Sequence, residues 1–136
     1  MRLLTPRGAL VPWVVRALGP ALAWSRGATY SGGMLFAFSI APATTPHDDG
    51  SMADIVARAV DVIRKSGLPH ETNSMFTIVE GDWDQVMPVI KAACEAVGEV
   101  SPRVSLVLKA DLRPGHTGEM TGKVERLDEQ IAKLEA

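Results

Sequence analysis

The stretch that decides the fold is Glu71-Thr72-Asn73-Ser74-Met75-Phe76-Thr77-Ile78-Val79-Glu80-Gly81-Asp82-Trp83. Its residues 75–80 predict a strand, because β-branched and aromatic side chains dominate there. The strand stops at Gly81, and Asp82 or Asp84 is a typical N-cap for a helix that follows at once. Hydroxyls, an amide and a carboxylate therefore gather around one strand and one turn. This pattern favours recognition of a small polar ligand over catalysis.

Outward from this stretch, the chain predicts the order β-α-β-β-α-β and then a further helix. The expected strands are 35–41, 68–73, 75–80 and 103–111. The first helix should begin at Ser51, with Asp54 completing a capping box, and should end at Gly67. The second should end at Gly98, with a kink or a shifted boundary at Pro88. The last helix carries apolar residues at heptad-like spacing: Val124, Leu127, Ile131 and Leu134.

This order predicts an α+β fold, a ferredoxin-like βαββαβ sandwich with an additional C-terminal helix. We expect the helices to cover the more apolar sheet face, formed by Phe36, Phe38, Ile40, Phe76, Ile78, Val104, Leu106 and Leu108. The other face would then carry Leu35, Ala37, Ser39, Met75, Thr77, Val79, Ser105 and Val107. That second face is too apolar to leave in water and too polar for a plain core. A second subunit's sheet should cover it, with a small ligand near the seam.

Composition excludes several classes of function. The chain has 136 residues and one cysteine, Cys94. A single cysteine rules out an internal disulfide framework, and we expect Cys94 to be a small core residue. The three histidines show no ligand spacing, so we expect neither a metal site nor a cofactor. Residues 34–136 carry 10 basic and 16 acidic side chains, and this net charge of −6 does not favour nucleic acid.

Residues 1–33 differ from the rest, because they hold four arginines and no acid. The apolar stretch 9–24 is shorter than the roughly 20 residues of a membrane span and contains Arg16, so no span is expected. We interpret residues 1–33 as a disordered or non-native extension. An export signal, with Ala21-Leu22-Ala23 resembling a cleavage site, and a functional arm remain alternatives. Residues 34–136 should form the domain, which we expect to be cytoplasmic.

The body resembles a family of small thiamine-binding, ferredoxin-like proteins, long grouped as conserved and uncharacterised. The resemblance rests on 34–40, Ser66-Gly67-Leu68-Pro69, 71–84, Ser101-Pro102-Arg103-Val104, 109–115 and 122–125, and it covers Met34 to about Leu134. The pairing of Thr-x-x-Glu-Gly with Lys-x-Asp-x-Arg is fairly specific. The resemblance implies binding of thiamine or its hydroxymethylpyrimidine moiety, assembly into dimers or tetramers, and no reaction.

Four residues are candidate ligand contacts, because an aminopyrimidine needs hydroxyls, amides and a carboxylate around an apolar surface. They are Ser39, Asn73, Thr77 and Glu80. Each also has a structural interpretation. Ser39 would be a buried hydroxyl that needs a partner, and Asn73 would form a turn. Thr77 would belong to a cross-strand hydroxyl pair, and Glu80 would be a carboxylate at a helix N-terminus.

Other residues are expected to be structural. Trp83 should cover a helix start, and Met75 should pack in an interface. Lys109 and Asp111 should pair across an oligomer seam.

The sequence thus predicts a non-catalytic, homo-oligomeric module that binds thiamine or hydroxymethylpyrimidine. The main alternative is a regulatory or structural oligomer that binds another metabolite or a protein. A small ferredoxin-like enzyme is a third possibility, although no phosphate loop, nucleophile elbow or metal motif is present. His70 and Glu71 would face opposite ways on a strand, so they do not form a hydrolytic dyad.

Overall fold

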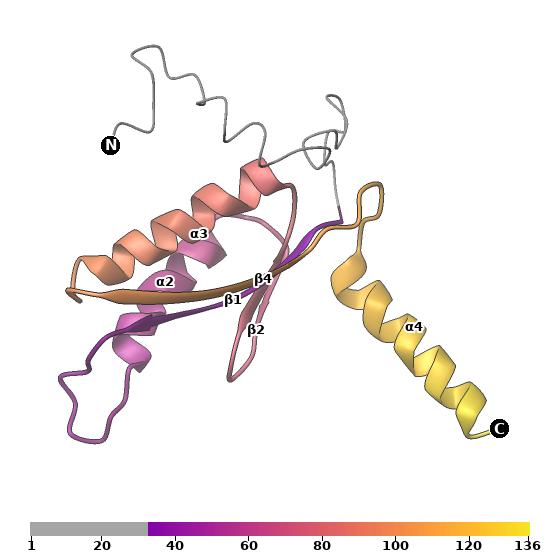
Figure 1. The fold of residues 1–136 in the computed structure, drawn as a ribbon, viewed down its shortest axis with the longest axis horizontal. Helices are drawn as coiled ribbons and strands as arrows, with labels where there is room; N and C mark the ends of the chain where they lie inside the picture. The colour runs from indigo at the N-terminus through magenta and orange to yellow at the C-terminus, as the bar shows by residue number, and fades with distance from the viewer. Residues whose placement is uncertain (1–32) are drawn as a thin grey trace, which may run out of the picture.

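A computed structural model describes residues 33–136, so the expectations for the 1–33 extension fall almost wholly outside the described residues. The elements are β1 (Leu35–Pro42), α2 (Ala53–Lys65), β2 (His70–Thr72), β3 (Thr77–Glu80), α3 (Trp83–Gly98), β4 (Val104–Asp111) and α4 (Glu119–Leu134). The strands form an antiparallel sheet in the order β2-β3-β1-β4. Helices α2 and α3 cover one face, and α4 projects away from the body (Figure 1). The predicted ferredoxin-like fold with an additional C-terminal helix is confirmed.

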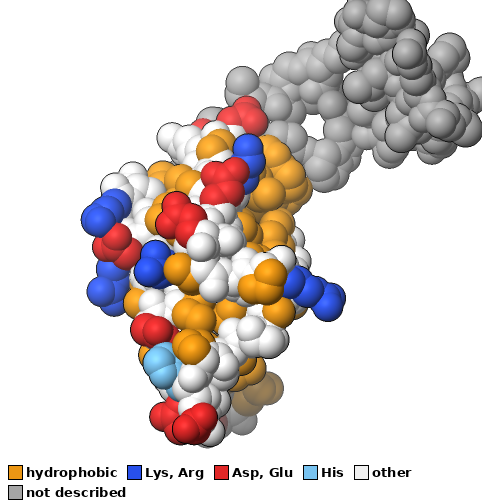
Figure 2. Space-filling model, turned by 90° about the vertical axis from the view of Figure 1, so that its left-hand side faces the viewer, with side chains coloured by type: hydrophobic (Ala, Val, Ile, Leu, Met, Phe, Trp, Pro, Cys, Tyr) orange, Lys and Arg blue, Asp and Glu red, His pale blue; other side chains and the backbone are white. Residues whose placement is uncertain are grey.

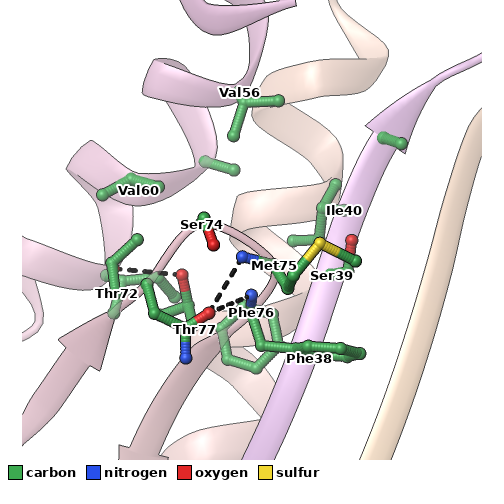
Figure 3. Close-up of a pocket in the computed structure, with 14 residues that line it drawn as sticks. Phe38, Ser39, Ile40, Val56, Val60, Thr72, Ser74, Met75, Phe76 and Thr77 are labelled. Carbon is green, nitrogen blue, oxygen red and sulfur yellow. Dashed lines mark hydrogen bonds between the residues drawn. The ribbon is translucent and has the colours of Figure 1, made fainter.

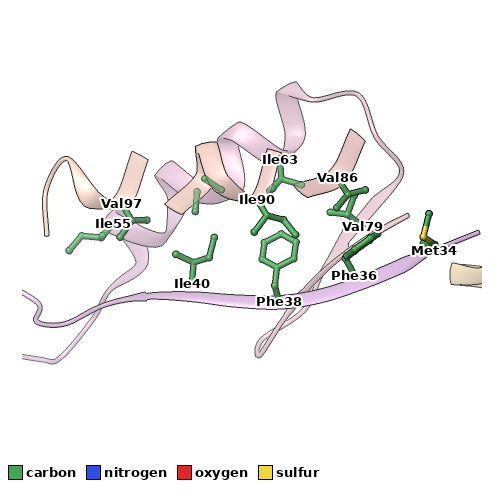
Figure 4. Packing of buried hydrophobic residues seen from close by; sticks show 12 residues of the cluster. Met34, Phe36, Phe38, Ile40, Ile55, Ile63, Val79, Val86, Ile90 and Val97 are labelled. Atoms are coloured by element: carbon green, nitrogen blue, oxygen red, sulfur yellow. The ribbon is translucent and has the colours of Figure 1, made fainter. Parts of the chain in front are cut away.

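The core lies between β1 and the two covering helices (Figure 4). Phe36, Phe38 and Ile40 alternate along β1 and are all at least 94% buried. They meet the apolar stripes of α2 and α3, whose buried members are Ile55, Ala59, Ile63, Val86, Ile90, Ala93 and Val97. Each large side chain contributes about 1.5–3 kcal/mol when it is removed from water. This contribution fixes which face of β1 turns inward.

The predicted phase of β3 is wrong. Thr77 pairs with Phe38 and Val79 pairs with Phe36, so both lie on the helix-covered face and are buried. Ile78 pairs with Ala37 on the opposite face. The prediction failed because β3 begins at Thr77 and Phe76 lies in the turn before it. The aromatic side chain of Phe76 therefore does not determine which face of β3 turns toward the helices. A buried threonine is tolerated here because its hydroxyl has a partner.

The helix starts are partly as predicted. Asp82 does cap α3 in a capping box with Gln85, whose Oε1 accepts from the Asp82 N–H. Ser51 does not cap α2, which begins at Ala53 after Met52 without a side-chain cap. The expected capping-box acid Asp54 instead pairs with a histidine of the preceding loop, His47, at 3.1 Å.

The stop at Gly67 is confirmed by its positive φ of 74°, which suits glycine. Helix α3 runs continuously through Pro88, so the boundary is not shifted.

The sheet face opposite α2 and α3 exposes Val107, which pairs with Ser39 across β1 and β4 and is 57% exposed. Ala37 and Lys109 form the next pair on the same face. The predicted placement of Ala37, Ser39 and Val107 on this face is therefore confirmed for β1 and β4. Within residues 33–136, no helix is both long and apolar enough to cross a membrane.

Candidate functional site

The site begins where the ladder between β1 and β3 stops. The Gly81 N–H donates to the Met34 carbonyl at 3.1 Å, which makes residues 34 and 81 a hydrogen-bonded pair. In an antiparallel ladder such pairs recur every second residue, so Phe36, Phe38 and Ile40 also direct their backbone groups toward β3. Pairing ends at Phe38 with Thr77. The N–H and C=O of Ile40 therefore point past the end of β3, beside the turn that joins β2 to β3.

A hollow of about 210 Å³ occupies this space (Figure 3). Its walls come from three segments: the end of β1, one side of α2 and the β2–β3 turn. The lining residues are Phe38, Ser39, Ile40, Ala41, Val56, Ala59, Val60, Ile63 and 72–77. Apolar side chains dominate, and a few polar groups interrupt them. That combination is typical of small-molecule sites.

The main polar feature of the wall is a pair of hydroxyls. Thr72 Oγ1 lies 3.1 Å from Thr77 Oγ1 across β2 and β3. One O–H serves as the donor between them, and the second O–H stays free to donate to another group. The cross-strand pair expected as the structural role of Thr77 is thus present. Thr77 also lines the hollow, but on the helix-covered face and not on the open face that the sequence predicted.

Asn73 organises the turn. Its side-chain Oδ1 accepts from the backbone N–H groups of Met75 at 2.9 Å and Phe76 at 2.8 Å. The turn role expected for this residue is therefore present, and the Nδ2 group is left over as a donor beside the hollow. Ser39 lies half-buried on the adjacent end of β1 and also lines the hollow.

Glu80, the fourth predicted contact, lies elsewhere. It lines a second hollow with Gly81, Gly118 and Met120, between the end of β3 and the start of α4. Its Oε1 accepts from the Glu119 N–H at 3.1 Å, and its Oε2 accepts from the Met120 N–H at 3.2 Å. Glu80 therefore caps a helix, as its structural interpretation held, but the helix is α4 and not the adjacent α3. The structure brings three of the four predicted residues together and sets Glu80 apart.

An ionic network continues from this cap. Glu119 is 4% exposed, and its Oε2 accepts from Arg126 at 2.7 Å and from Arg113 at 3.3 Å. The Arg126 hydrogen bond is the main reason that the pKa of the Glu119 carboxyl lies below its ordinary value. Asp111 pairs with Lys123 of α4, so its described partner lies within the chain and not across a seam. These contacts join the start of α4 to the sheet.

Trp83 and Cys94 both contact the core, as residues with a structural role do. Trp83 stands at the first position of α3, with its ring centroid 5.7 Å from that of Phe36. Cys94 packs against the core as expected, and burial raises the pKa of its thiol. Met75 is 72% exposed and borders the hollow.

Sequence reasoning missed two contributors to the hollow. Thr72 was overlooked because nothing in the sequence shows which hydroxyl lies opposite Thr77. The free backbone groups of Ile40 depend on where β3 begins, and no side chain signals that boundary.

Possible metal ligands among the described residues, and the charge on one face of the molecule (Figure 2), are two further features that bear on the kind of site. On the face that Figure 2 shows, acidic and basic side chains are interspersed with apolar ones, without a continuous basic surface. No group of three or more histidine, cysteine, aspartate or glutamate side chains among residues 33–136 is placed to hold a metal ion.

The fold and the hollow define a small ferredoxin-like protein with an apolar hollow at the end of β1, interrupted by a few polar groups. Comparison with known proteins identifies the group: the family model of the thiamine-binding protein matches residues 36–128, and the chain belongs to that family. UPF0045 protein Mb1933 of Mycobacterium bovis is 45% identical over 103 residues, which cover 75% of this chain and 98% of that protein.

Solved structures agree on the fold. Protein MJ1052 of Methanocaldococcus jannaschii superposes with a TM-score of 0.63 at 30% identity, covering 71% of this chain and 96% of that one. A Thermotoga maritima protein named for thiamine biosynthesis or salvage gives a TM-score of 0.56 at 22% identity, covering 67% and 97% of the two chains. The second likeness supports the fold alone.

Proposed function

We propose that this protein binds thiamine, or its hydroxymethylpyrimidine moiety, in the hollow beside Ile40, and that it catalyses no reaction. Membership of the thiamine-binding family supports the class of ligand. The observation that carries the proposal is the free strand edge, which offers one N–H and one C=O side by side at an apolar hollow.

The strand edge matches the chemistry of the pyrimidine. An aminopyrimidine carries a ring nitrogen, which accepts a hydrogen bond, next to an exocyclic amine, which donates one. The Ile40 N–H can donate to the ring nitrogen while its C=O accepts from the amine. The free O–H of the Thr72 and Thr77 pair and the Nδ2 of Asn73 supply further donors for ring nitrogens or for the hydroxymethyl group. Phe38 and Phe76 flank these groups and offer flat apolar surfaces.

The size of the hollow favours the pyrimidine half over the whole vitamin. Its volume of about 210 Å³ is below the roughly 300–1,000 Å³ of pockets that enclose drug-sized ligands. In this proposal the pyrimidine occupies the hollow, and the cationic thiazolium extends outward. The net charge of −6 on residues 34–136 favours approach of such a cation.

We further propose that the open sheet face is covered by a second copy of the chain. Val107, Ala37 and Ser39 lie together on this face, which α2 and α3 leave uncovered. Ser39 belongs both to this face and to the lining of the hollow, so self-association and ligand binding would meet at one residue. Lys109 lies on the same face beside Ala37 and is placed to contribute a polar contact at the interface edge.

The test compares two threonine substitutions by calorimetric titration with hydroxymethylpyrimidine. Thr77→Val keeps the shape but removes a hydroxyl from the hollow, and it should weaken binding by about 1 kcal/mol, the net value of a neutral hydrogen bond. Thr121→Val is the matched control, because Thr121 is exposed on α4 beside the other hollow. Equal affinities in both variants and the wild-type protein would place the ligand elsewhere.

A further inference from the structure

A large apolar side chain stands in water at the rim of the hollow beside Ile40. Met75 is 72% exposed, and among the large apolar side chains of residues 33–136 only Leu134, at the end of α4, is more exposed. A single apolar residue at a protein surface needs no explanation by itself. Met75 differs because it also lines the hollow, so a ligand that fills the hollow can remove this side chain from water.

The turn between β2 and β3 holds the backbone of Met75 in place. The Met75 N–H donates to Asn73 Oδ1 at 2.9 Å, and the Phe76 N–H donates to the same oxygen at 2.8 Å. The Asn73 N–H in turn donates to the Phe76 carbonyl at 2.9 Å. These three hydrogen bonds fix the Cα of Met75 at the rim. The unbranched side chain beyond it has three rotatable bonds, so it can adjust to the shape of a bound ligand.

The side chain of Met75 reaches from one wall of the hollow toward another. In Figure 3 it extends from the β2–β3 turn toward the end of β1, where Ser39 and Ile40 lie. In the proposed binding mode the pyrimidine forms hydrogen bonds with the backbone of Ile40. A group attached to the pyrimidine then leaves the hollow past the rim, where it meets the thioether of Met75.

Met75 can distinguish a ligand with two rings from a ligand with one. The hollow of about 210 Å³ takes the pyrimidine, and the thiazolium ring of thiamine extends outward past the rim. A thioether is polarizable and contacts aromatic rings favourably, with its sulfur roughly 5 Å from the ring. Packing the thioether against the thiazolium also removes apolar surface of both groups from water. Hydroxymethylpyrimidine carries only a hydroxyl at this position and makes no such contact.

We infer that Met75 is a specificity-determining residue, which makes the site prefer thiamine to its pyrimidine half by packing against the thiazolium ring. The inference rests on the proposed function, because it uses the position assigned to the pyrimidine. The attraction between the acidic body and a cation also favours thiamine. That attraction does not depend on Met75, which is uncharged, so a neutral substitution at Met75 separates the two effects.

Calorimetric titration of full-length variants with thiamine and with hydroxymethylpyrimidine tests the role of Met75. Met75→Ala should weaken thiamine binding by about three- to tenfold and leave hydroxymethylpyrimidine binding unchanged, because only thiamine reaches the thioether. Met75→Leu keeps a large apolar side chain and should recover most of the loss. Thr77→Val should weaken both ligands by the same factor. Val100→Ala is the matched control, because Val100 is 45% exposed and lines a different hollow, and it should change neither affinity.

The outcomes separate this inference from the proposed function. If neither ligand binds to the wild-type protein, both are wrong. If both ligands bind, and Met75→Ala weakens them equally or not at all, only the inference about Met75 is overturned. Light scattering adds one further outcome: a lower mass for Met75→Ala with both affinities unchanged would assign Met75 to a subunit interface and would also overturn the inference.

Discussion

Replacing Glu80 with glutamine tests the anchor of α4. The two carboxylate oxygens accept from the Glu119 and Met120 N–H groups at 3.1 and 3.2 Å, and Glu80 is only 8% exposed. Glutamine keeps one oxygen acceptor but turns an NH2 group toward the second N–H. The helix therefore loses one charge-assisted hydrogen bond, which contributes about 1.5–3 kcal/mol, and the favourable charge at its N-terminus.

This cost should appear as local opening of α4, because α4 has few other contacts with the body. A loss of about 2 kcal/mol raises the population of the open first turn by roughly 30-fold. Amide hydrogen exchange at Glu119 and Met120 measures this directly, and protection there should fall by about that factor. Protection in the core of α3 should change little.

Glu71→Gln is the matched control, because Glu71 is an exposed glutamate on the edge strand β2. It should leave the exchange of both α4 amides unchanged. If Glu80→Gln also leaves them unchanged, or if both variants lose protection equally, the two hydrogen bonds do not hold the helix.

Three further predictions concern residues 1–33, the open sheet face and the effect of low pH on α4. A chain that begins at Met34 should keep its melting temperature and its mass in solution. Val107→Glu should reduce the mass in light scattering, because it places a charge on the proposed sheet interface. The pKa of Glu119 lies below its ordinary value of 4.5, chiefly through Arg126. The anchor of α4 should therefore be intact above about pH 4.5 and weaken as pH falls through the lower folded pKa, visible in amide exchange.

Each of these predictions has a clear contrary result. A large loss of stability without residues 1–33 would make that segment part of the domain. A wild-type protein that is a monomer at micromolar concentration would contradict the proposed sheet interface. Exchange in α4 that is independent of pH below 4.5, after correction for intrinsic rates, would mean that the Glu119 network does not support the helix.

The fold was predictable from the sequence because its signals are strong and local. Alternation along 35–41, the i, i+4 stripes before Gly67 and Gly98, and the Asp82 cap each indicate one element. Their order then leaves few topologies. The errors arose at boundaries: Ser51 does not cap α2, and β3 begins two residues later than the pattern suggested.

The site was predictable only in part, for the same reason. Ser39, Asn73 and Thr77 do line one hollow. The face assigned to Thr77 was wrong, because β3 begins after Phe76 and the side chain of Phe76 therefore does not set which face of the strand is buried. The role of Glu80 depends on a contact with a residue 39 positions later, which no local pattern reveals. The backbone groups of Ile40 carry no sequence signal at all.

The most direct test of the proposed function is a calorimetric titration of the wild-type protein with three ligands: hydroxymethylpyrimidine, thiamine, and the thiamine analogue in which an oxo group replaces the pyrimidine amine. The proposal predicts that the first two bind at one site per chain. The analogue should bind at least tenfold more weakly, because an oxygen acceptor would face the Ile40 carbonyl and a ring N–H would face the Ile40 N–H. No binding of any of the three at millimolar concentration, or equal affinity for thiamine and the analogue, would contradict the account.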